Sequence, residues 1–533
     1  MATTTARAPG RRSAWAPLRR PVFRMLFAAQ VVSNIGTWMQ TVGAQWFLVE
    51  TSGSPAFVAW IQTASQLPVL LLSLVAGVTA DLVDRRRLLL VTSLASCVVA
   101  GALTAVTVAG ALTPWGLLGL TFVLGCSAAM TGPAWQAVQP QLVPRDELPE
   151  ASALGSIAVN AARAVGPAVA GVVVSAAGPA VVFALNTLSF LAVTVALLAW
   201  REEALPVRTV RERAWPGLLA GLRYVRSAPS VRRILARCAL FALPGSALWA
   251  LLPSAARDLM GADAAGYSLL LALLGAGAIA GAVAMPRLRA RLSRSWLLAG
   301  GALLFAAGTA AAAWLPLAAS AAAALVAGVG WLTCLTTLNA TMQLALAGWV
   351  RARGLATYML VFMGSQALGS FAWGAVADAV GVRTALTAAA AALVLVAASV
   401  PLLPLLAHSG TMDRSVVPLS SSMPTLELEA PPATPTAIVL TYRVRPQHVA
   451  AFLDAMHDVR LARERSGGTG WQLLRRAEDP EEMVEVFVAP SWEEHQLQHT
   501  VRWTGYDAQV LARAVALAED EPTAAHYLVQ GVR

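Results

Sequence analysis

The sequence has 533 residues, of which 57% are hydrophobic and only 13% are charged, against roughly 25% charged residues in soluble proteins. A chain of this length with so few charges cannot cover a folded surface with polar groups, which excludes a water-soluble globular protein and indicates a polytopic membrane protein. The formal net charge of +10 comes entirely from arginine, and because the arginines fall mostly in short loops, no nucleic-acid partner is expected.

Twelve apolar stretches are long enough to cross a bilayer, which takes about 20 residues. They lie near residues 22–49, 56–80, 88–110, 114–137, 151–175, 180–200, 232–256, 265–285, 295–315, 317–347, 354–377 and 384–406. The arginines before the first stretch resemble the start of a signal peptide, but the polar amides within it and the lack of a clear cleavage site favour a retained first helix. The sequence therefore predicts an all-α membrane domain of twelve helices whose partner is the lipid bilayer.

Arginine also predicts the orientation of these helices, because cytoplasmic loops of membrane proteins are enriched in basic residues. The N-terminus and the loops after the second, sixth, eighth and tenth stretches carry two or more arginines, and the loop after the fourth carries Arg145. The loops after the third, fifth and ninth stretches carry none, and those after the seventh and eleventh carry Arg257 and Arg383 only. This alternation predicts that both termini lie in the cytoplasm.

The apolar stretches repeat in groups of three. Gly77, Gly171, Gly281 and Gly374 lie near the ends of the second, fifth, eighth and eleventh stretches. We expect a cytoplasmic arm at 1–21, a six-helix half at 22–200, a cytoplasmic loop at 201–231 and a second six-helix half at 232–406. Two such halves are the architecture of facilitator transporters.

The character of the chain changes after residue 406. Residues 407–435 are rich in proline and serine and predict a linker. Residues 436–533 alternate strand-like and helix-like segments in the order β-α-β-β-α-β, which predicts a cytoplasmic ferredoxin-like sandwich. The fold class is therefore an all-α membrane protein with a small α+β domain at its C-terminus.

The loop between the second and third stretches combines a glycine, an acid and an arginine run: Gly77, Asp81, Arg85, Arg86 and Arg87. It resembles the loop between helices two and three of major facilitator superfamily transporters. It departs from that pattern at Leu82, where arginine is common, and at Asp84, where glycine is common. The resemblance implies a charge clamp that holds one access state; alternatively, the arginines only fix topology.

The fifth stretch carries Arg163 near its middle, with no charged residue within ten positions. Because a charge at the bilayer centre costs about 3 kcal/mol, Arg163 must face a cavity or a partner, for substrate binding, coupling or a structural ion pair. Gly166, Pro167 and Gly171 follow it and resemble the glycine-proline motif of helix five in exporters of the superfamily. The glycines also allow plain close helix packing.

Polar side chains in other apolar stretches are candidates for a central cavity. The strongest are Gln30, Asn34, Gln62, Asn339 and Gln366, together with Arg163, and the same reasoning extends to Gln40, Gln45, Gln66 and Arg237. Each of these could instead form an ordinary hydrogen bond between helices. A carboxylate proton relay is not apparent in the first six stretches.

No metal, cofactor or catalytic site is expected. The cysteines Cys97, Cys126, Cys238 and Cys334 lack metal-ligand spacing and lie within apolar stretches, so disulfides are not expected. His495 and His499 are four residues apart on a predicted helix, which could provide half of a metal site. Without a third ligand, exposed helix histidines are the favoured interpretation.

The tail, with Trp471, Trp492 and His495, resembles small ferredoxin-like domains of the antibiotic-biosynthesis monooxygenase type, which implies a homodimer through the tail. The whole chain resembles exporters similar to the enterobactin-exporter group. That resemblance implies a proton-driven exporter of a small molecule, such as a siderophore, drug or metabolite, in a bacterial inner (plasma) membrane. Because the tail has no cofactor motif, it is not expected to be an enzyme. A transporter fused to a cargo-modifying domain and a non-transporting membrane scaffold remain alternatives.

Overall fold

The computed structural model describes residues 15–200, 223–406, 412–417 and 434–529. The chain divides into two compact units, and each is described by itself. The first unit contains most of the helical residues, within Met1–Val207, Ala239–Thr336 and Leu360–Leu402. The second unit contains residues within Arg208–Cys238, Thr337–Met359 and Leu403–Arg533, so it joins the tail to the ends of three long helices.

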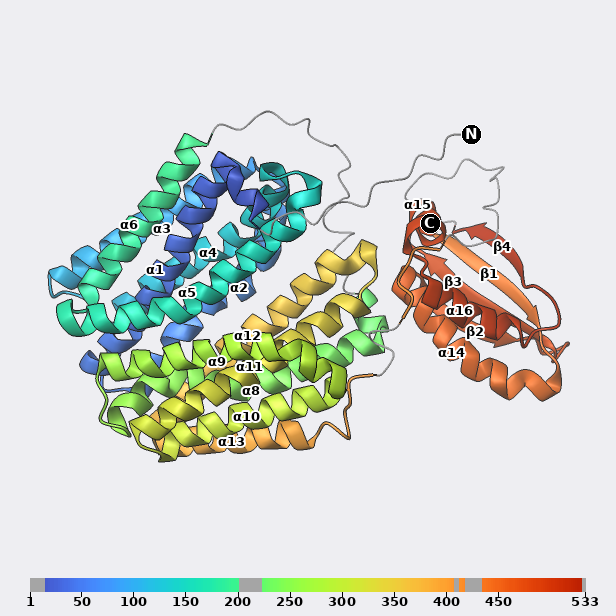
Figure 1. The fold of residues 1–533 in the computed structure, drawn as a ribbon. Helices are drawn as coiled ribbons and strands as arrows, with labels where there is room; N and C mark the ends of the chain where they lie inside the picture. Colours follow the sequence, from blue (N-terminus) through green and yellow to red (C-terminus); the bar gives the residue numbers. More distant parts are fainter. Residues whose placement is uncertain (1–14, 201–222, 407–411, 418–433, 530–533) are drawn as a thin grey trace, which may run out of the picture. The chain divides into compact units, whose positions relative to one another are not determined.

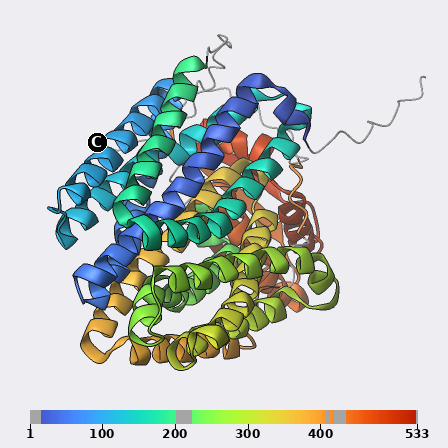
Figure 2. The ribbon, with the colours of Figure 1, turned by 60° about the vertical axis from the view of Figure 1, so that its left-hand side comes forward.

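Long helices account for nearly all described residues between 21 and 398. The N-terminal half contains α1 (Pro21–Thr51), α2 (Pro55–Leu82), α3 (Arg85–Val108), α4 (Pro114–Leu142), α5 (Leu148–Ala177) and α6 (Pro179–Ala199). The C-terminal half contains α8 (Pro229–Asp258), α9 (Ala264–Arg291), α10 (Arg294–Trp314), α11 (Leu317–Ala345), α12 (Arg351–Val380) and α13 (Val382–Ala398). In two views, the blue-to-teal helices form one bundle and the green-to-orange helices form another (Figure 1 and Figure 2).

Local sequence signals explain where these helices begin. Proline occupies the first helical position of α1, α2, α4, α6 and α8, where its missing N–H has no intrahelical partner to lose. The Thr113 hydroxyl accepts a hydrogen bond from Gly116 N at the start of α4, and the Asp263 carboxylate does the same for Gly266 N at the start of α9. Such N-caps satisfy backbone donors that the helix leaves free.

Ten of the described helices are long and apolar enough to cross a membrane. The helices α1 and α13 are not among them. Amide side chains reduce the hydropathy of α1, although it has 31 residues, and α13 has only 17 residues. The structure therefore confirms a polytopic helical protein, whereas the count of twelve membrane spans stays a prediction.

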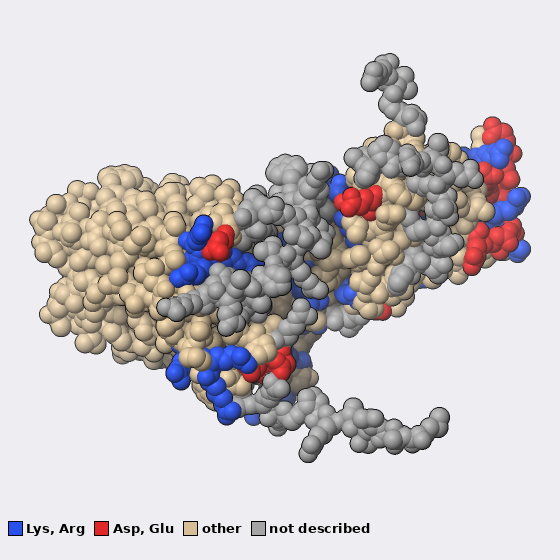
Figure 3. Space-filling view, turned by 90° about the horizontal axis from the view of Figure 1, so that it is seen from above, with Lys and Arg blue, Asp and Glu red and all other residues tan. Residues whose placement is uncertain are grey.

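Charged side chains are unevenly distributed over the helices. On the face drawn in Figure 3, the helical part presents a broad surface without charged residues, and its arginines gather at one end. Large apolar side chains such as Leu94, Val98, Leu188 and Val283 are exposed along this part of the molecule. An apolar surface with a basic end matches a protein whose helices face lipid and whose loops face water.

The tail contains a four-stranded antiparallel sheet covered by helices on one face. The strands β1 (Thr436–Arg443), β2 (Thr469–Arg475), β3 (Glu482–Ala489) and β4 (Thr523–Leu528) are ordered β2-β3-β1-β4. The helices α14 (Val449–Ser466) and α16 (Gly505–Val515) pack on it through Phe452, Met456 and Val510. The short α15 (Trp492–Leu497) follows β3. The predicted β-α-β-β-α-β order is therefore present.

A buried ionic network connects the sheet of the tail to α14. Glu485 on β3 is fully buried and accepts hydrogen bonds from Arg463 Nε at 3.1 Å, Tyr442 Oη at 2.8 Å and Trp471 Nε1 at 2.9 Å. Because the carboxylate has three donors, its charge is compensated despite its burial. The network fixes the position of α14 on the sheet.

We expect Glu485→Leu to destabilise the tail by about 3–5 kcal/mol, because the substitution leaves the Arg463 guanidinium buried without its carboxylate. Hydrogen exchange of the β3 amides in the full-length protein measures this loss. Glu482→Leu on the same strand is the matched control, since Glu482 pairs with Arg476 near the surface at 3.0 Å, and we expect it to cost about 1 kcal/mol or less. Equal protection in both variants would contradict the role of the network.

Candidate functional site

Asp84 and Arg86, at the junction of α2 and α3, make contacts inside the N-terminal half. The Asp84 carboxylate caps α3 by accepting a hydrogen bond from Arg87 N at 2.7 Å. The Arg86 guanidinium donates to the carbonyl oxygens of Leu197 and Leu198, both at 3.1 Å, at the end of α6. The departure from the superfamily pattern at residue 84 therefore has a local reason, because an aspartate is a strong N-cap.

The structure describes less of the other residues of the predicted clamp. Gly77 and Asp81 lie in the last turns of α2, and the Asp81 side chain is outside the described residues. Arg85 is half-buried and Arg87 is exposed at the start of α3. The clamp between Asp81 and these arginines stays a prediction.

Arg163 lies on α5 against an aromatic ring of α1. Its guanidinium carbon is 5.6 Å from the centre of the Trp38 ring, within the range of a cation–π interaction. Its Nε is buried without a hydrogen-bond partner, and no ion pair to Arg163 is found within the described ranges. The structure thus gives Arg163 an aromatic neighbour, while donors of the guanidinium remain available to a ligand.

The glycines after Arg163 lie at close helix crossings. A Cβ atom on Gly166 would lie 2.6 Å from Trp38 Cβ on α1, and one on Gly171 would overlap Ser268 on α9. Gly275 on α9 also packs closely on α5, since a Cβ atom on it would lie 3.1 Å from Ala164 Cα. Pro167 is buried inside α5, which continues to Ala177. This side of α5 is where the two halves approach each other.

A second set of contacts joins the halves between α2 and α12. Ser54 Oγ donates to Asp378 Oδ1 at 2.7 Å, and Thr63 Oγ1 donates to the Ala367 carbonyl at 3.0 Å. The rings of Trp60 and Phe371 stack at 5.3 Å. The residues from α2 lie at its start and in its first half, and the residues from α12 lie in its second half.

Gln45 on α1 forms a third contact with the C-terminal half. Its Oε1 accepts a hydrogen bond from Tyr267 Oη at 2.6 Å, and its Nε2 is 3.5 Å from the Trp249 carbonyl oxygen. Sequence reasoning included Gln45 among the polar candidates but missed Tyr267 and Trp249, which are more than 200 positions away and carry no distinctive local pattern. Gln40 is also engaged, since it accepts a hydrogen bond from Asn186 on α6.

The other candidates for a cavity are only partly brought together. Gln30 Nε2 donates to Asn34 Oδ1 at 3.0 Å on α1, so these two form one polar group. Gln366 is buried on α12 with its Oε1 unpaired, and Gln62 is half-buried on α2. In the second unit, Asn339 Oδ1 accepts from Gln343 Nε2 at 2.6 Å. Arg237 is almost fully buried and donates to the Leu403 carbonyl, which is a structural contact.

The tail histidines correct one expectation. His495 is 2% exposed rather than on the surface, and its Nε2 lies 3.1 Å from His526 Nε2 of β4, a neighbour that sequence reasoning missed. The His495 and His499 rings are 4.7 Å apart. Burial lowers the pKa of both to about 4, so both are neutral at pH 7. Within the described part of the tail, no group of three metal ligands has a metal-binding arrangement.

The description "transmembrane secretion effector" belongs to a family model that matches residues 12–531 of this chain. The staphyloferrin A transporter of Staphylococcus aureus (strain NCTC 8325 / PS 47) is 29% identical over 153 residues, which cover 28% of this chain and 38% of that protein. The multidrug efflux pump Tap of Mycobacterium tuberculosis (strain ATCC 25618 / H37Rv) is 29% identical over 223 residues, which cover 39% of this chain and 51% of that protein. The chain thus spans about half, or less, of the length of these curated relatives.

Solved transporters share the arrangement of the helices. The nucleoside transporter NupG (D323A mutant) matches with a TM-score of 0.60 at 10% identity, covering 74% of this chain and 100% of that one. A bacterial homolog of the human lysosomal transporter Spinster, in an inward-facing and occupied conformation, matches with a TM-score of 0.59 at 15% identity, covering 73% and 97%. At these identities the likeness concerns the fold alone.

We expect Gly171→Ala to destabilise the protein by about 1–3 kcal/mol, because the added methyl group overlaps Ser268 and forces α5 and α9 apart. Thermal unfolding in detergent measures the effect. Gly119→Ala on α4 is the matched control, since a Cβ atom there meets nothing within 4 Å. A Gly171→Ala protein as stable as this control would show that the helices do not meet closely at residue 171.

Proposed function

We propose a function from two premises: this chain belongs to the transmembrane secretion effector family, and its helices adopt the fold of major facilitator transporters. The proposed function is secondary active export of a small molecule by alternating access, coupled to protons. The observation that carries it is the family match over nearly the whole chain. The relatives include a staphyloferrin A transporter and efflux pumps for drugs and macrolides, so the cargo class is a siderophore, a drug or a related metabolite.

The arginine pattern supports the proposed orientation. The loop after α2 and the ends of α9 and α10 that meet at residue 293 carry clusters of arginine, which mark the cytoplasmic side. Counting α1 and α13 as spans gives twelve crossings and places both termini in the cytoplasm, with the protein in a bacterial plasma membrane. α1 can cross despite its polar amides because Gln40 and Gln45 are buried against α6, α8 and α9.

The contacts between the halves support an alternating-access mechanism. Ser54 with Asp378 and Gly171 with Ser268 lie at helix ends that this orientation puts outside. We therefore propose that the structure represents the state closed to the outside. Rocking of the halves would separate these contacts and bring the cytoplasmic ends together, where Asp81 and the arginines after it would latch the closed side.

Arg163 is the proposed cargo-binding cation. Its guanidinium is held against Trp38 on the crossing of α1 and α5, and its Nε has no partner among the described residues. The polar group of Gln30 and Asn34 lies on the same helix as Trp38, one to two turns away. A cation beside an aromatic ring suits an anionic or aromatic cargo.

The tail adds a second module. Its β-α-β-β-α-β order and its sheet order β2-β3-β1-β4 support a ferredoxin-like fold of the antibiotic-biosynthesis monooxygenase type. The resemblance of the whole chain to the enterobactin-exporter group and the pairing of the tail into a homodimer stay predictions.

The most direct test of the proposed function compares metabolites in the medium and in cells of a deletion strain and its parent. Accumulation inside the deletion cells supports export, and depletion there would indicate import.

We expect Arg163→Ala to reduce export about tenfold or more, because the cargo loses a charge-assisted contact worth about 1.5–3 kcal/mol. Efflux from cells loaded with the identified cargo measures the loss, with the amount of protein in the membrane checked in parallel. Arg383→Ala is the matched control, since Arg383 also lies over a tryptophan ring, Trp314, at 5.0 Å. Normal export by Arg163→Ala would contradict the proposed role.

We expect a cross-link between Ser54→Cys and Asp378→Cys to stop export, because it prevents the halves from separating at the outer side. The paired variant is made after Cys97, Cys126, Cys238 and Cys334, which are all free, are replaced by serine. Export should fall on oxidation and return on reduction, while Ser54→Cys alone should be insensitive. Full export by the cross-linked protein would refute the outward-closed assignment.

A further inference from the structure

A cavity of about 960 Å³ lies within the second unit. Its walls come from α14 and α16 of the tail, from residues 228–230 where α8 begins, and from the segment that contains Met412 and Arg414. Neither the family match nor the transport function assigns a role to this cavity.

Hydrogen bonds hold the walls of the cavity in place. Ser227 Oγ donates to Glu464 at 3.0 Å, and Arg465 Nη1 donates to the Ser227 carbonyl at 3.4 Å, which joins α14 to the chain before α8. Tyr506 N donates to the Asp413 carbonyl at 2.9 Å, which holds the 412–417 segment against α16. The cavity is partly open, and it is bordered by hydrogen-bonded elements of one unit.

Two of the three arginines that line the cavity are neutralised by carboxylates. Arg513 pairs with Asp458 at 3.0 Å, and the buried Arg465 pairs with Asp507 at 2.7 Å. The third, Arg414, has no carboxylate partner within the described part of the chain. The cavity thus carries one uncompensated positive charge.

Arg414 also has unused hydrogen-bond donors. Among the described residues, its Nε and Nη1 are buried without a hydrogen-bond partner, and its Nη2 donates to the Met412 thioether sulfur at 2.7 Å. Sulfur is a weak acceptor, and a buried guanidinium without an oxygen partner is costly. The Arg465 Nε is also buried and unpaired. These donors are oriented by the Tyr506 ring, which lies 5.5 Å from the Arg414 guanidinium and 5.7 Å from that of Arg465.

The rest of the lining is largely apolar. Leu406, Leu461, Val510 and Pro229 contribute hydrocarbon surface. Pro229 is also the first residue of α8, a helix long and apolar enough to cross a membrane. A ligand that fills this space must combine an anionic group with an apolar body.

We propose that the cavity binds an anionic amphiphile, whose phosphate or carboxylate head accepts hydrogen bonds from Arg414 and whose hydrocarbon body packs on Leu406, Leu461 and Pro229. A guanidinium suits both head groups because its parallel N–H donors match two oxygens. A membrane phospholipid and a soluble amphiphilic anion share this chemistry. The site is separate from the transport path proposed around Arg163, so its occupancy can be measured without a known cargo.

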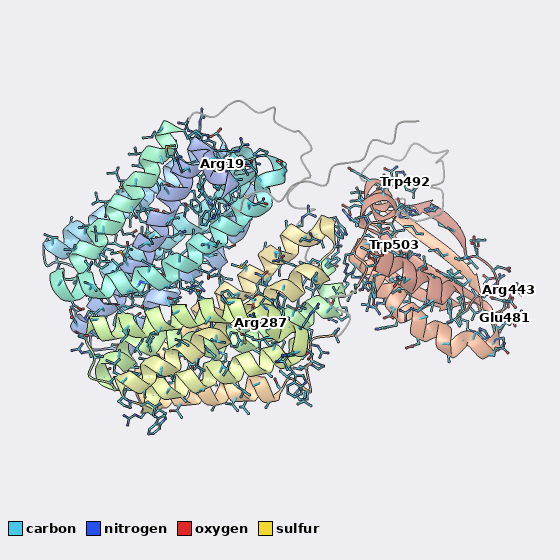
Figure 4. All side chains as sticks on the ribbon, viewed as in Figure 1. Arg19, Arg287, Arg443, Glu481, Trp492 and Trp503 are labelled. Carbon is cyan, nitrogen blue, oxygen red and sulfur yellow. The ribbon has the colours of Figure 1, made fainter. Side chains whose placement is uncertain are left out.

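Binding of radiolabelled dodecyl phosphate to the full-length protein in phosphatidylcholine nanodiscs tests the proposal. We expect saturable binding of one molecule per chain, and about tenfold weaker binding by Arg414→Gln, because a charge-assisted hydrogen bond is lost. Arg443→Gln is the matched control: Arg443 is an exposed tail arginine near Glu481, at the end of the tail away from Trp503 (Figure 4). Equal binding by the two variants, or no saturable binding, would overturn the proposal.

A second variant keeps the proposal testable if Arg414→Gln misfolds. Ala512→Trp adds a large side chain to the exposed lining of α16 while keeping every charge, and we expect it to abolish binding as well. If Ala512→Trp folds and binds dodecyl phosphate normally, the ligand does not occupy this cavity.

Two further measurements identify the source of the ligand. Phosphatidylglycerol in the nanodisc should compete with dodecyl phosphate if the natural occupant is a lipid, and should have no effect if the occupant is a soluble anion. Inorganic phosphate should compete weakly in both cases, because it lacks the apolar body. Competition by inorganic phosphate as strong as that by dodecyl phosphate would contradict the amphiphile class.

Discussion

Close packing of small residues between α5 and α9 is the constraint on which the helical part of this protein depends. Lipid tails are as apolar as the helices, so little hydrophobic driving force holds helices together in a bilayer, and van der Waals contact at short distance must replace it. Gly171 against Ser268 and Gly275 against Ala164 provide that contact between the two halves. Because glycine contacts are weak individually and reversible, they suit an interface that opens in the proposed alternating-access mechanism.

The elements of the fold could be predicted from the sequence because each depends on local composition. A run of about 20 apolar residues must form a helix in a membrane, whatever its neighbours are, and the predicted stretches correspond to helices in the structure. The strands of the tail could also be predicted from their local sequence. The contacts of the loop arginines could not be predicted in this way. Arg86 caps α6 through the carbonyls of Leu197 and Leu198, and no local pattern encodes a contact with a residue 111 positions away.

The candidate site was predictable as a set of residue types but not as a set of contacts. An arginine within a membrane helix must have a partner, so Arg163 could be singled out, whereas the choice of Trp38 over a carboxylate depends on how α1 crosses α5. The same limit applies to Gln45, whose partner Tyr267 lies on the other half. It also applies to His526, which reaches His495 only because β4 returns to the sheet beside β1.

Three helices contribute residues to both units, which would connect the tail to the proposed transport cycle. α8, α11 and α12 each pass from the first unit to the second, near residues 238, 336 and 359. An α-helix transmits displacement along its axis because its backbone hydrogen bonds resist bending. If the C-terminal half rocks as proposed, the start of α8 moves with it and carries the part of the cavity wall formed by Pro229 and Ser230. A ligand that favours one shape of this cavity therefore favours one access state by its difference in affinity for the two shapes.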